Sequence, residues 1–398
     1  MNYEDLSHGR KNFCRHALIA VFLLLCAAVE LNIVKPASAN IIGCAESEIV
    51  RILNQAEERG INGNVFISSE GNLVVDQGLG WTSRERTQKV KSDTLFNIAS
   101  VSKAITATAI FALREKNRLK LDWPLARFFS NVPADKAEIT IAELLDHTSC
   151  IPQKYAADGK RSQNDAVSAV FATPLKCRPG RSFVYSDDNY ALLAAIIERA
   201  GGQSYEEYVR SHVFNRAAMS QTMFWSEIDD RDTPNVARIL NPPSVGVFRG
   251  TNWGYIGSGG IWSTAHDLAR FALALGRGDI ISKASVEEML RPREKVSIGW
   301  ATYGWFVVTT PAGSRLIVSR GNEDWGHSAV IYWRPGTKTV VSVTSNSGFD
   351  QGVPFARVLA GQIEPFVLQD QAPCPHVSPI PPDTFRSSTP SARLLAGR

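Results

Sequence analysis

The chain has 398 residues, of which 21% are charged and 44% are hydrophobic, and its formal net charge is +4 at pH 7. This composition is typical of a folded globular protein and excludes an intrinsically disordered chain. The small net charge predicts no nucleic-acid-binding surface. The Cys and His residues lack the spacing of a metal site, so we expect no bound metal. We expect no other cofactor.

The first 39 residues have the pattern of a secretory signal peptide. Basic residues at positions 10, 11 and 15 precede the apolar run Ala17 to Val29, and Ala37-Ser38-Ala39 places small residues at a cleavage position. The apolar run is short for a membrane span. We therefore expect cleavage after Ala39, no stable membrane span afterwards, and a periplasmic or secreted protein. An uncleaved anchor is the alternative.

Hydrophobic periodicity divides residues 40–370 into a sheet-forming part and a helical part. We expect a sheet sub-domain from residues 40–100 and 295–370, interrupted by a helical insertion over about 110–290. The Pro- and Ser-rich residues 371–398 are expected to form a flexible tail. The clearest expected elements are a helix over Ala45 to Arg59, a hairpin of Asn64 to Ser69 and Asn72 to Gln77, helices over Tyr190 to Ala200 and Ala265 to Leu275, strands over Arg315 to Arg320, Ser328 to Trp333 and Thr339 to Thr344, and a helix over Phe355 to Ile363.

Ser100-Val101-Ser102-Lys103 is the strongest chemical signal in the chain. It follows a short extended run, Thr94 to Ala99, and opens a patterned helix. Residues three apart share one helix face, so the Ser100 hydroxyl and the Lys103 ammonium can meet, and a first-turn N–H has no partner within the helix. A serine hydroxyl requires such an activating neighbour to act as a nucleophile. The tetrad therefore predicts an activated serine, although an S-x-x-K match alone has low specificity.

Further segments in a fixed order raise that specificity. They are Phe96 to Thr106 around Ser100, Leu119 to Asp122, Ile141 to Ser149, Pro179-Gly180 followed by Tyr185-Ser186-Asp187, and Ser258 to Phe271. Together they resemble the class C β-lactamase and serine DD-peptidase family, the penicillin-binding-protein-like serine hydrolases, over about residues 45 to 365. The resemblance implies an α+β fold of the β-lactamase/transpeptidase type, with an antiparallel sheet flanked by helices and a mainly helical sub-domain.

The third motif of this family, K-x-G or H-x-G on the strand beside the nucleophile, has two candidate positions. His327 is one, but counting back from Pro335 and Asn346 with the family's spacing leads to Arg320-Gly321-Asn322. With the motif at Arg320, the region contains three predicted strands. With the motif at His327, it contains one strand too few. We therefore place the motif at Arg320. His147 is expected to bond a loop backbone rather than to act in catalysis.

The resemblance implies a role for each motif residue. Ser100 attacks a carbonyl carbon, and Lys103 and Tyr185 form the base system. The backbone N–H groups of Ser100 and Glu323 stabilise the oxyanion. Arg320, a fixed planar cation, stabilises a Tyr185 phenolate or binds a substrate carboxylate. The residues expected to contact substrate are Asp187, Gly321, Asn322 and Trp325.

The chain departs from the family pattern at three of these positions. Asp187 stands where Asn is usual, Arg320 replaces Lys or His, and Asn322 replaces the last Gly of the motif. A carboxylate near Lys103 favours the ammonium form and raises the pKa of that lysine, which favours Tyr185 as the base. Losing the amide also makes β-lactams doubtful natural substrates.

Four cysteines remain after removal of the leader: Cys44, Cys150, Cys177 and Cys374. In an oxidising compartment four cysteines favour two disulfides, with three possible pairings. The resembled fold implies Cys44 with Cys374 and Cys150 with Cys177. Free buried thiols are the alternative.

The leading functional hypothesis is a secreted serine hydrolase that forms an acyl-enzyme on Ser100 with an ester, an amide or a D-amino-acid peptide. Its partner would be a small-molecule or peptidoglycan-derived substrate, and the sequence does not predict an oligomeric state. A second hypothesis, motivated by Asp187 and Arg320, is a catalytically weak cell-wall-binding or sensor protein of the same fold. A third, a nucleophile elbow at Gly326-His327-Ser328, requires a helix after the serine, whereas Val330 to Trp333 favours a strand.

Overall fold

The computed structural model describes residues 37–228, 233–238, 252–310 and 313–368. A first unit, Met1–Cys44, is described only from Ala37, where helix α2 (Ala37–Glu58) begins. The account below concerns the second unit, Ala45–Arg398. Most of the predicted leader, and the predicted tail over residues 371–398, lie outside the described residues. None of the described helices is long and apolar enough to cross a lipid bilayer.

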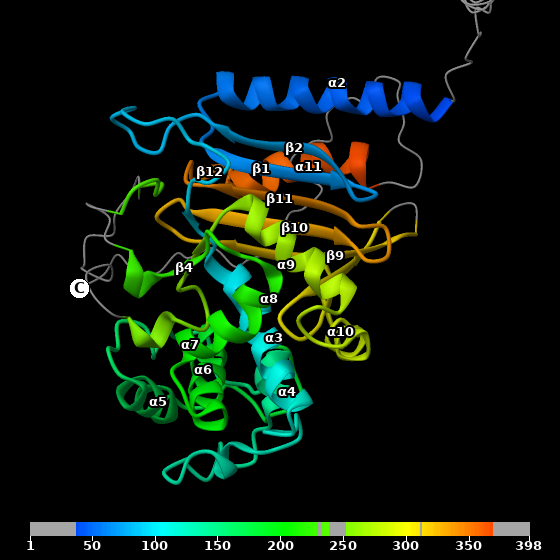
Figure 1. Ribbon diagram of the computed structural model, residues 1–398. Helices are drawn as coiled ribbons and strands as arrows, with labels where there is room; N and C mark the ends of the chain where they lie inside the picture. The colour runs from blue at the N-terminus through cyan, green and yellow to red at the C-terminus, as the bar shows by residue number, and fades with distance from the viewer. Residues whose placement is uncertain (1–36, 229–232, 239–251, 311–312, 369–398) are drawn as a thin grey trace, which may run out of the picture. The chain divides into compact units, whose positions relative to one another are not determined.

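The described strands include an eight-stranded sheet with the order β2-β1-β11-β10-β9-β8-β7-β6, in which every neighbouring pair is antiparallel. Segments that precede and follow the helical part of the chain therefore contribute to one sheet (Figure 1). The bounds are β1 Gly63–Ser69, β2 Asn72–Leu79, β6 Glu294–Val296, β7 Gly299–Ala301, β8 Phe306–Thr309, β9 Arg315–Asn322, β10 Ser328–Arg334 and β11 Thr339–Ser345.

Local sequence explains why these segments fold as they do. The β1–β2 hairpin turns at Glu70 and Gly71, whose φ angles of 51° and 89° are those that a tight two-residue hairpin requires. Helix α9 (Ala265–Arg277) begins where the Thr264 side chain accepts a hydrogen bond from the Asp267 N–H, and it ends at Gly278 in the left-handed conformation. The predicted hairpin and this helix are confirmed.

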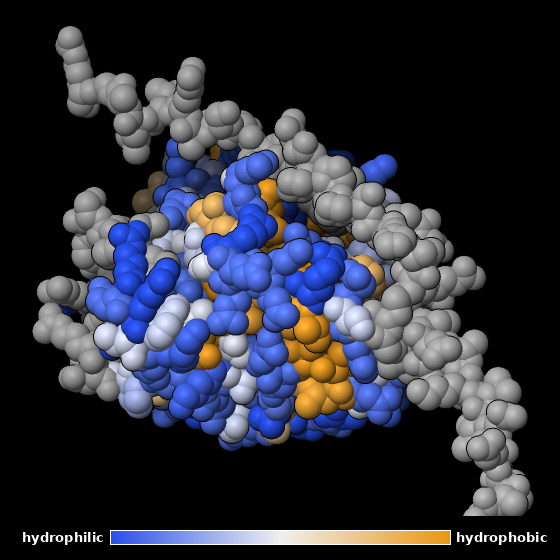
Figure 2. Space-filling view, turned by 90° about the horizontal axis from the view of Figure 1, so that it is seen from above, coloured by the Kyte–Doolittle hydropathy of each residue, from blue (hydrophilic) through white to orange (hydrophobic). Residues whose placement is uncertain are grey.

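Both faces of the sheet are covered. On one face, α2 from Ala45 onward and the last helix, α11 (Phe355–Val367), pack in a cluster that includes Val65, Val330 and Leu359. On the other face lie α9 and the helical part of the chain, whose cluster includes Ile331 and Phe271 (Figure 1). Because strand side chains alternate, neighbouring residues of one strand belong to different clusters. Seen from above, the α2 side is mainly hydrophilic with an apolar area (Figure 2).

The helical part lies between β2 and β6 in the sequence. A small sheet with the order β3-β5-β4 joins it to the large sheet near the nucleophile segment. The remaining bounds are β3 Phe96–Asn97, α3 Ser102–Glu115, α4 Ile141–Leu145, α5 Gln163–Ala172, α6 Asp187–Gly201, α7 Tyr205–Val209, α8 Asn215–Ala217, β4 Met223–Phe224, β5 Ile261–Ser263, α10 Lys283–Met289, β12 Phe349–Asp350 and β13 Val353–Pro354.

The predicted antiparallel α+β arrangement is therefore present, with strands returning at Glu294, one residue before the expected sheet segment 295–370. Ser328 is the first residue of strand β10 and not a turn between a strand and a helix. This placement excludes the nucleophile elbow at Gly326-His327-Ser328.

Candidate active site

Ser100 lies in a tight turn between β3 and α3. Residues Ala99–Val101 form a 3₁₀ turn and α3 begins at Ser102, so the α-helix starts two residues later than predicted. Ala99 has a φ of 48°, in the left-handed region, and its N–H donates to Asn97 Oδ1 at 3.0 Å. The Asn97 N–H donates to Nδ1 of the fully buried His327 at 3.1 Å. His327 therefore helps to fix the nucleophile turn, because it accepts a hydrogen bond from Asn97, whose side chain binds Ala99.

Lys103 lies against the Ser100 hydroxyl. Its Nζ donates to Ser100 Oγ at 2.9 Å and to the carbonyl oxygen of Ser258 at 2.8 Å, and it forms an ion pair with Asp187 Oδ1 at 2.5 Å. The other carboxylate oxygen of Asp187 accepts from Gln153 Nε2 at 2.8 Å, and the Asp187 N–H donates to Gln153 Oε1 at 2.6 Å. Asp187 is therefore held by the protein on both sides.

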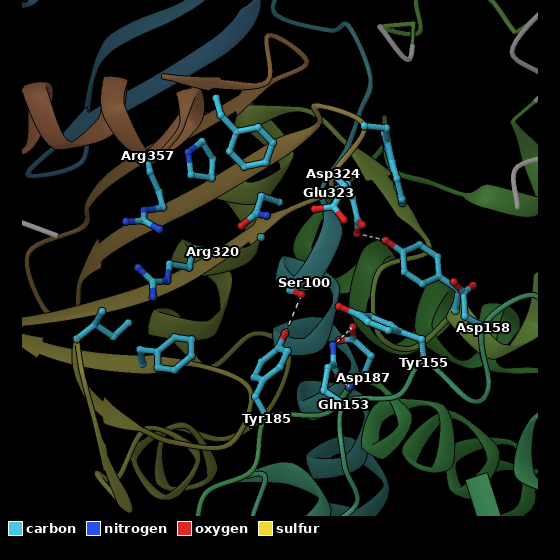
Figure 3. A pocket seen from close by; sticks show the side chains of 18 of the residues that line it. Ser100, Gln153, Tyr155, Asp158, Tyr185, Asp187, Arg320, Glu323, Asp324 and Arg357 are labelled. Carbon is cyan, nitrogen blue, oxygen red and sulfur yellow. Dashed lines mark hydrogen bonds between the residues drawn. The ribbon is translucent and has the colours of Figure 1, made fainter. Parts of the chain in front are cut away.

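Tyr185 completes the group from the segment before α6. Its hydroxyl donates to Ser100 Oγ at 2.8 Å (Figure 3). The ring packs on His147, with centroids 4.4 Å apart, and His147 Nδ1 accepts from the N–H of Ser186 at 3.2 Å. The carbonyl oxygen of His147 also accepts from the Val184 N–H at 2.8 Å. His147 therefore bonds the loop backbone, as predicted, and fixes the ring of Tyr185.

A disulfide joins Cys150 to Cys177 in the loop region that precedes Tyr185. This is the pairing that the resemblance implied. The Lys176 N–H also donates to the carbonyl oxygen of Cys150 at 2.9 Å, so the two segments are tied twice. The second predicted pair, Cys44 with Cys374, cannot be located because Cys374 lies outside the described residues.

The charges around Ser100 set the resting protonation states. Burial opposes the charge of Lys103, but the Asp187 carboxylate and Tyr185 outweigh it, and the pKa of Lys103 is raised. Burial also raises the pKa of Tyr185, against the opposing effect of the Lys103 ammonium. The raised lysine pKa agrees with the expectation from sequence. Because the phenol pKa is raised as well, Tyr185 is also protonated at rest, and both groups donate to Ser100 Oγ.

Strand β9 approaches the nucleophile at Gly321. A Cβ on Gly321 would lie 2.4 Å from the backbone nitrogen of Ser100, so only glycine fits there. Gly321, the middle residue of the predicted Arg320-Gly321-Asn322 motif, is therefore the residue of β9 that lies against the nucleophile turn. Strand alternation then places Ser319, which is 3% exposed, on the Ser100 side of the strand, and Arg320 on the other side. Ser319 and Arg320 both line a cavity of about 20 Å³ together with Lys103 and Tyr185.

The backbone donors of the oxyanion also differ from the expectation. The Glu323 N–H donates to the carbonyl oxygen of His327 at 2.8 Å, so it belongs to the β9–β10 pairing and cannot serve a substrate. Bonded and non-bonded pairs alternate in an antiparallel ladder, and Asn322 pairs with Ser328 next to that bond. The Asn322 N–H therefore points away from β10. Together with the first-turn N–H of Ser100, it replaces Glu323 as the candidate donor.

Arg320 lines the small cavity together with Tyr185, and its guanidinium extends toward the sheet. Its guanidinium lies 5.8 Å from the centre of the Phe306 ring and near Arg357 of α11 (Figure 3). Burial and the neighbouring Arg357 lower the pKa of Arg320 to about 10. The hydrogen bonds of the described residues do not join Arg320 to Tyr185 directly, although Tyr185 acts to raise the pKa of Arg320.

A cavity of about 800 Å³ opens onto Ser100. The described residues that line it include the predicted substrate-contact residues Asp187, Gly321, Asn322 and Trp325. They also include Tyr255, from a segment expected to border the site, and Gln153 and Arg357, which sequence analysis did not identify. Ser319 is detectable in principle from strand alternation once Gly321 is placed, whereas Gln153 and Arg357 carry no local signal.

Comparison with known proteins places this geometry in a family. A family model described as Beta-lactamase matches residues 49–362. Over 254 residues the chain is 30% identical to PbpX of Bacillus subtilis, a match that covers 64% of this chain and 64% of PbpX. It is also 27% identical to penicillin-binding protein 4* of the same organism, covering 77% of this chain and 74% of that protein.

Solved structures share the fold. The octameric penicillin-binding protein homologue from Pyrococcus abyssi superposes with a TM-score of 0.68 and 26% identity, over 81% of this chain and 76% of that one. The D-amino acid amidase from Ochrobactrum anthropi SV3, at 21% identity, has a TM-score of 0.68 over 81% of this chain and 98% of its own. The fold is therefore the β-lactamase/transpeptidase fold, and the chain belongs to the β-lactamase family of serine hydrolases.

Proposed function

We propose that this protein is an exported serine hydrolase that acts through an acyl-enzyme on Ser100, with ester, amide or D-amino-acid peptide substrates. The observation that carries the proposal is the contact of Ser100 Oγ with both Lys103 Nζ, at 2.9 Å, and Tyr185 OH, at 2.8 Å. Such contacts give a serine hydroxyl a path for its proton.

In the proposed reaction, Ser100 Oγ attacks the substrate carbonyl and the N–H groups of Ser100 and Asn322 receive the oxyanion. The serine proton reaches the leaving group through Tyr185 or Lys103, the bond to the leaving group breaks, and water then hydrolyses the acyl ester. One of the two relay groups must first lose a proton. The Lys103–Asp187 pair at 2.5 Å offers a route, since transfer of a proton to Asp187 leaves a neutral amine beside Ser100.

The test is turnover of a panel of esters, amides, D-alanyl peptides and a chromogenic β-lactam by the wild-type protein and by Ser100→Ala. Ser102→Ala is the matched control, because Ser102 directly follows the nucleophile turn and its buried hydroxyl has no hydrogen-bond partner in the described structure. We expect Ser102→Ala to retain turnover and Ser100→Ala to lose at least about 1,000-fold. Equal turnover by wild type and Ser100→Ala excludes the proposal.

A second candidate function is that of a catalytically weak cell-wall-binding or sensor protein. It is supported by the protonated states of Lys103 and Tyr185 and by the ion pair that holds Asp187. It predicts that peptidoglycan fragments bind, measured by calorimetry, while no member of the panel is turned over. Ready turnover argues against it.

The proposal also includes export of the protein from the cytoplasm. It is supported by the pattern of residues 1–39 and by the Cys150–Cys177 disulfide, since such bonds persist in oxidising compartments. Mass determination of the N-terminus of the protein recovered outside the cytoplasm should give Asn40 as the first residue. Recovery with Met1 intact supports the uncleaved anchor instead.

A further inference from the structure

The charged side chains that line the cavity are separated by sign. Arg320 and Arg357 lie on one side of Ser100, and Asp158, Glu323 and Asp324 lie on the other (Figure 3). The nucleophile stands between the two groups. A molecule whose reacting carbonyl reaches Ser100 therefore extends toward positive charge in one direction and toward negative charge in the other.

The basic side is formed by two different elements. Arg320 comes from β9 and Arg357 from the first turn of α11. The ion pairs found in the described part of the chain do not include Arg320, whose guanidinium faces the Phe306 ring. Two neighbouring guanidinium groups repel each other in a partly buried site, and an anion between them offsets that repulsion. A planar carboxylate matches the donor geometry of guanidinium.

In the described part of the chain, the ion pairs do not include the acidic residues Asp158, Glu323 and Asp324. Glu323 accepts a hydrogen bond from the Tyr255 hydroxyl, and Asp158 Oδ1 accepts from the Gly159 N–H at 2.8 Å. Burial, with a further contribution from Asp187, raises the pKa of Glu323 to about 8. Lys103 also acts on Glu323, but its ammonium is engaged with Asp187. A cationic ligand group on this side lets these carboxyl groups ionise together.

We propose, resting on the function proposed above, that the substrate of this enzyme is bipolar, with an ammonium on one arm and a carboxylate on the other arm of the reacting carbonyl. The chemical class is a short peptide or related amino-acid conjugate with both ends free. Ser100 Oγ forms an ester with the carbonyl, the C–N or C–O bond to the second unit breaks, and the serine proton leaves with that unit. Water then releases the first unit as a carboxylic acid.

The experiment measures how ligands slow the labelling of Ser100 by a fluorophosphonate. Four forms of alanyl-alanine, in each combination of configurations, are compared: both ends free, N-acetylated, C-amidated, and capped at both ends. We expect the form with both ends free to protect Ser100 at a concentration at least about tenfold lower than any capped form, because each cap removes one charge.

Two variants assign the charges to their sides. Arg357→Gln should abolish the advantage of a free carboxylate and leave that of a free ammonium, and Asp324→Asn should do the reverse. The labelling rate of each variant without ligand is its own reference, and a thermal melt checks that it is folded. Loss of both advantages in one variant contradicts the separation of charge.

The outcomes distinguish this inference from the proposed function. Absence of labelling on Ser100 in the wild-type protein rejects the proposed function. Labelling that is slowed equally by all four forms, or by none of them, rejects the bipolar substrate alone.

Discussion

Gly321 determines how closely strand β9 approaches the nucleophile. Its backbone faces the Ser100 nitrogen, and a Cβ there would also lie 2.7 Å from the carbonyl oxygen of Ile98. Both contacts are with backbone, which cannot move aside as a flexible side chain can. The position of the reactive hydroxyl therefore depends on the absence of a single methyl group.

Gly321→Ala is expected to displace the turn and reduce kcat/KM by about 10- to 100-fold, which corresponds to about 1–3 kcal/mol of overpacking. The matched control is Gly361→Ala on α11, where a Cβ meets no atom within 4 Å. That change should stabilise the protein by about 0.5–1 kcal/mol through helix propensity. Steady-state kinetics and urea unfolding measure both effects. Wild-type activity in Gly321→Ala contradicts the proposed packing.

Asp187 controls the proton on Lys103. Removing its charge in Asp187→Asn leaves burial as the main influence, so the pKa of Lys103 should fall and the limb of the kcat/KM–pH profile that reports this group should move to lower pH by at least about one unit. We also expect faster acylation by β-lactams, because the amide regains an N–H donor. A profile that superposes on that of the wild type shows that the ion pair does not set this titration.

At the scale of elements, the loop before α6 positions Tyr185. The Cys150–Cys177 disulfide and the bonds of His147 hold this loop against the segment after α4. The tyrosine hydroxyl therefore reaches Ser100 from a segment without regular secondary structure of its own, and its position depends on these ties.

Breaking the disulfide in a Cys150→Ser, Cys177→Ser double variant is expected to lower the free energy of unfolding by about 2–4 kcal/mol. The activity should fall as well, because Tyr185 loses one of its ties. Chemical unfolding with and without reductant gives the measurement. The wild type should respond to reductant more strongly than the double variant, which keeps only the predicted Cys44–Cys374 bond. If reductant leaves the wild-type midpoint unchanged, the bond contributes nothing to stability.

The sequence predicted the elements with strong periodicity, including β1, β2, β9, β10, β11 and α11, because a regular apolar pattern can be satisfied in few ways. It also identified Ser100, Lys103 and Tyr185, which the structure brings together. The side chains of β9 that face the nucleophile were not predicted. Strand alternation places Ser319 on the Ser100 side of the strand and Arg320 on the other side.

Other residues of the site could not be predicted for a different reason. Gln153, which holds Asp187, and Arg357, which lies near Arg320, reach the cavity through tertiary packing of distant segments. No local pattern marks them. Sequence patterns therefore predicted the reacting groups, but they did not predict the residues that orient and surround those groups.

At the scale of the whole molecule, acid stability depends on two histidines that fold in the neutral form. Burial lowers the pKa of both His147 and His327 to about 3, from an ordinary value of 6.5. The unfolded chain therefore binds more protons below pH 6.5, and this contribution to stability is lost as the pH falls toward 3. Asp146 and Glu323, whose pKa values are raised by burial to about 6 and about 8, act in the opposite direction.

A variant isolates the histidine contribution from these opposing groups. His327→Gln keeps an acceptor for the Asn97 N–H and removes the titration. The stability advantage of the wild type over His327→Gln should shrink by roughly 2 kcal/mol between pH 7 and pH 5. Urea unfolding at the two pH values measures it, and an advantage that does not change with pH shows that His327 is not held neutral.

The measurement that tests the central claim most directly is the location of a covalent acyl or phosphonyl adduct. The intact protein is treated with a fluorophosphonate, digested, and mapped by tandem mass spectrometry. The account predicts one added group on the Ser100 side chain, lost in Ser100→Ala and retained in Ser102→Ala. An adduct on another residue, or an unmodified Ser100 in folded protein, contradicts it.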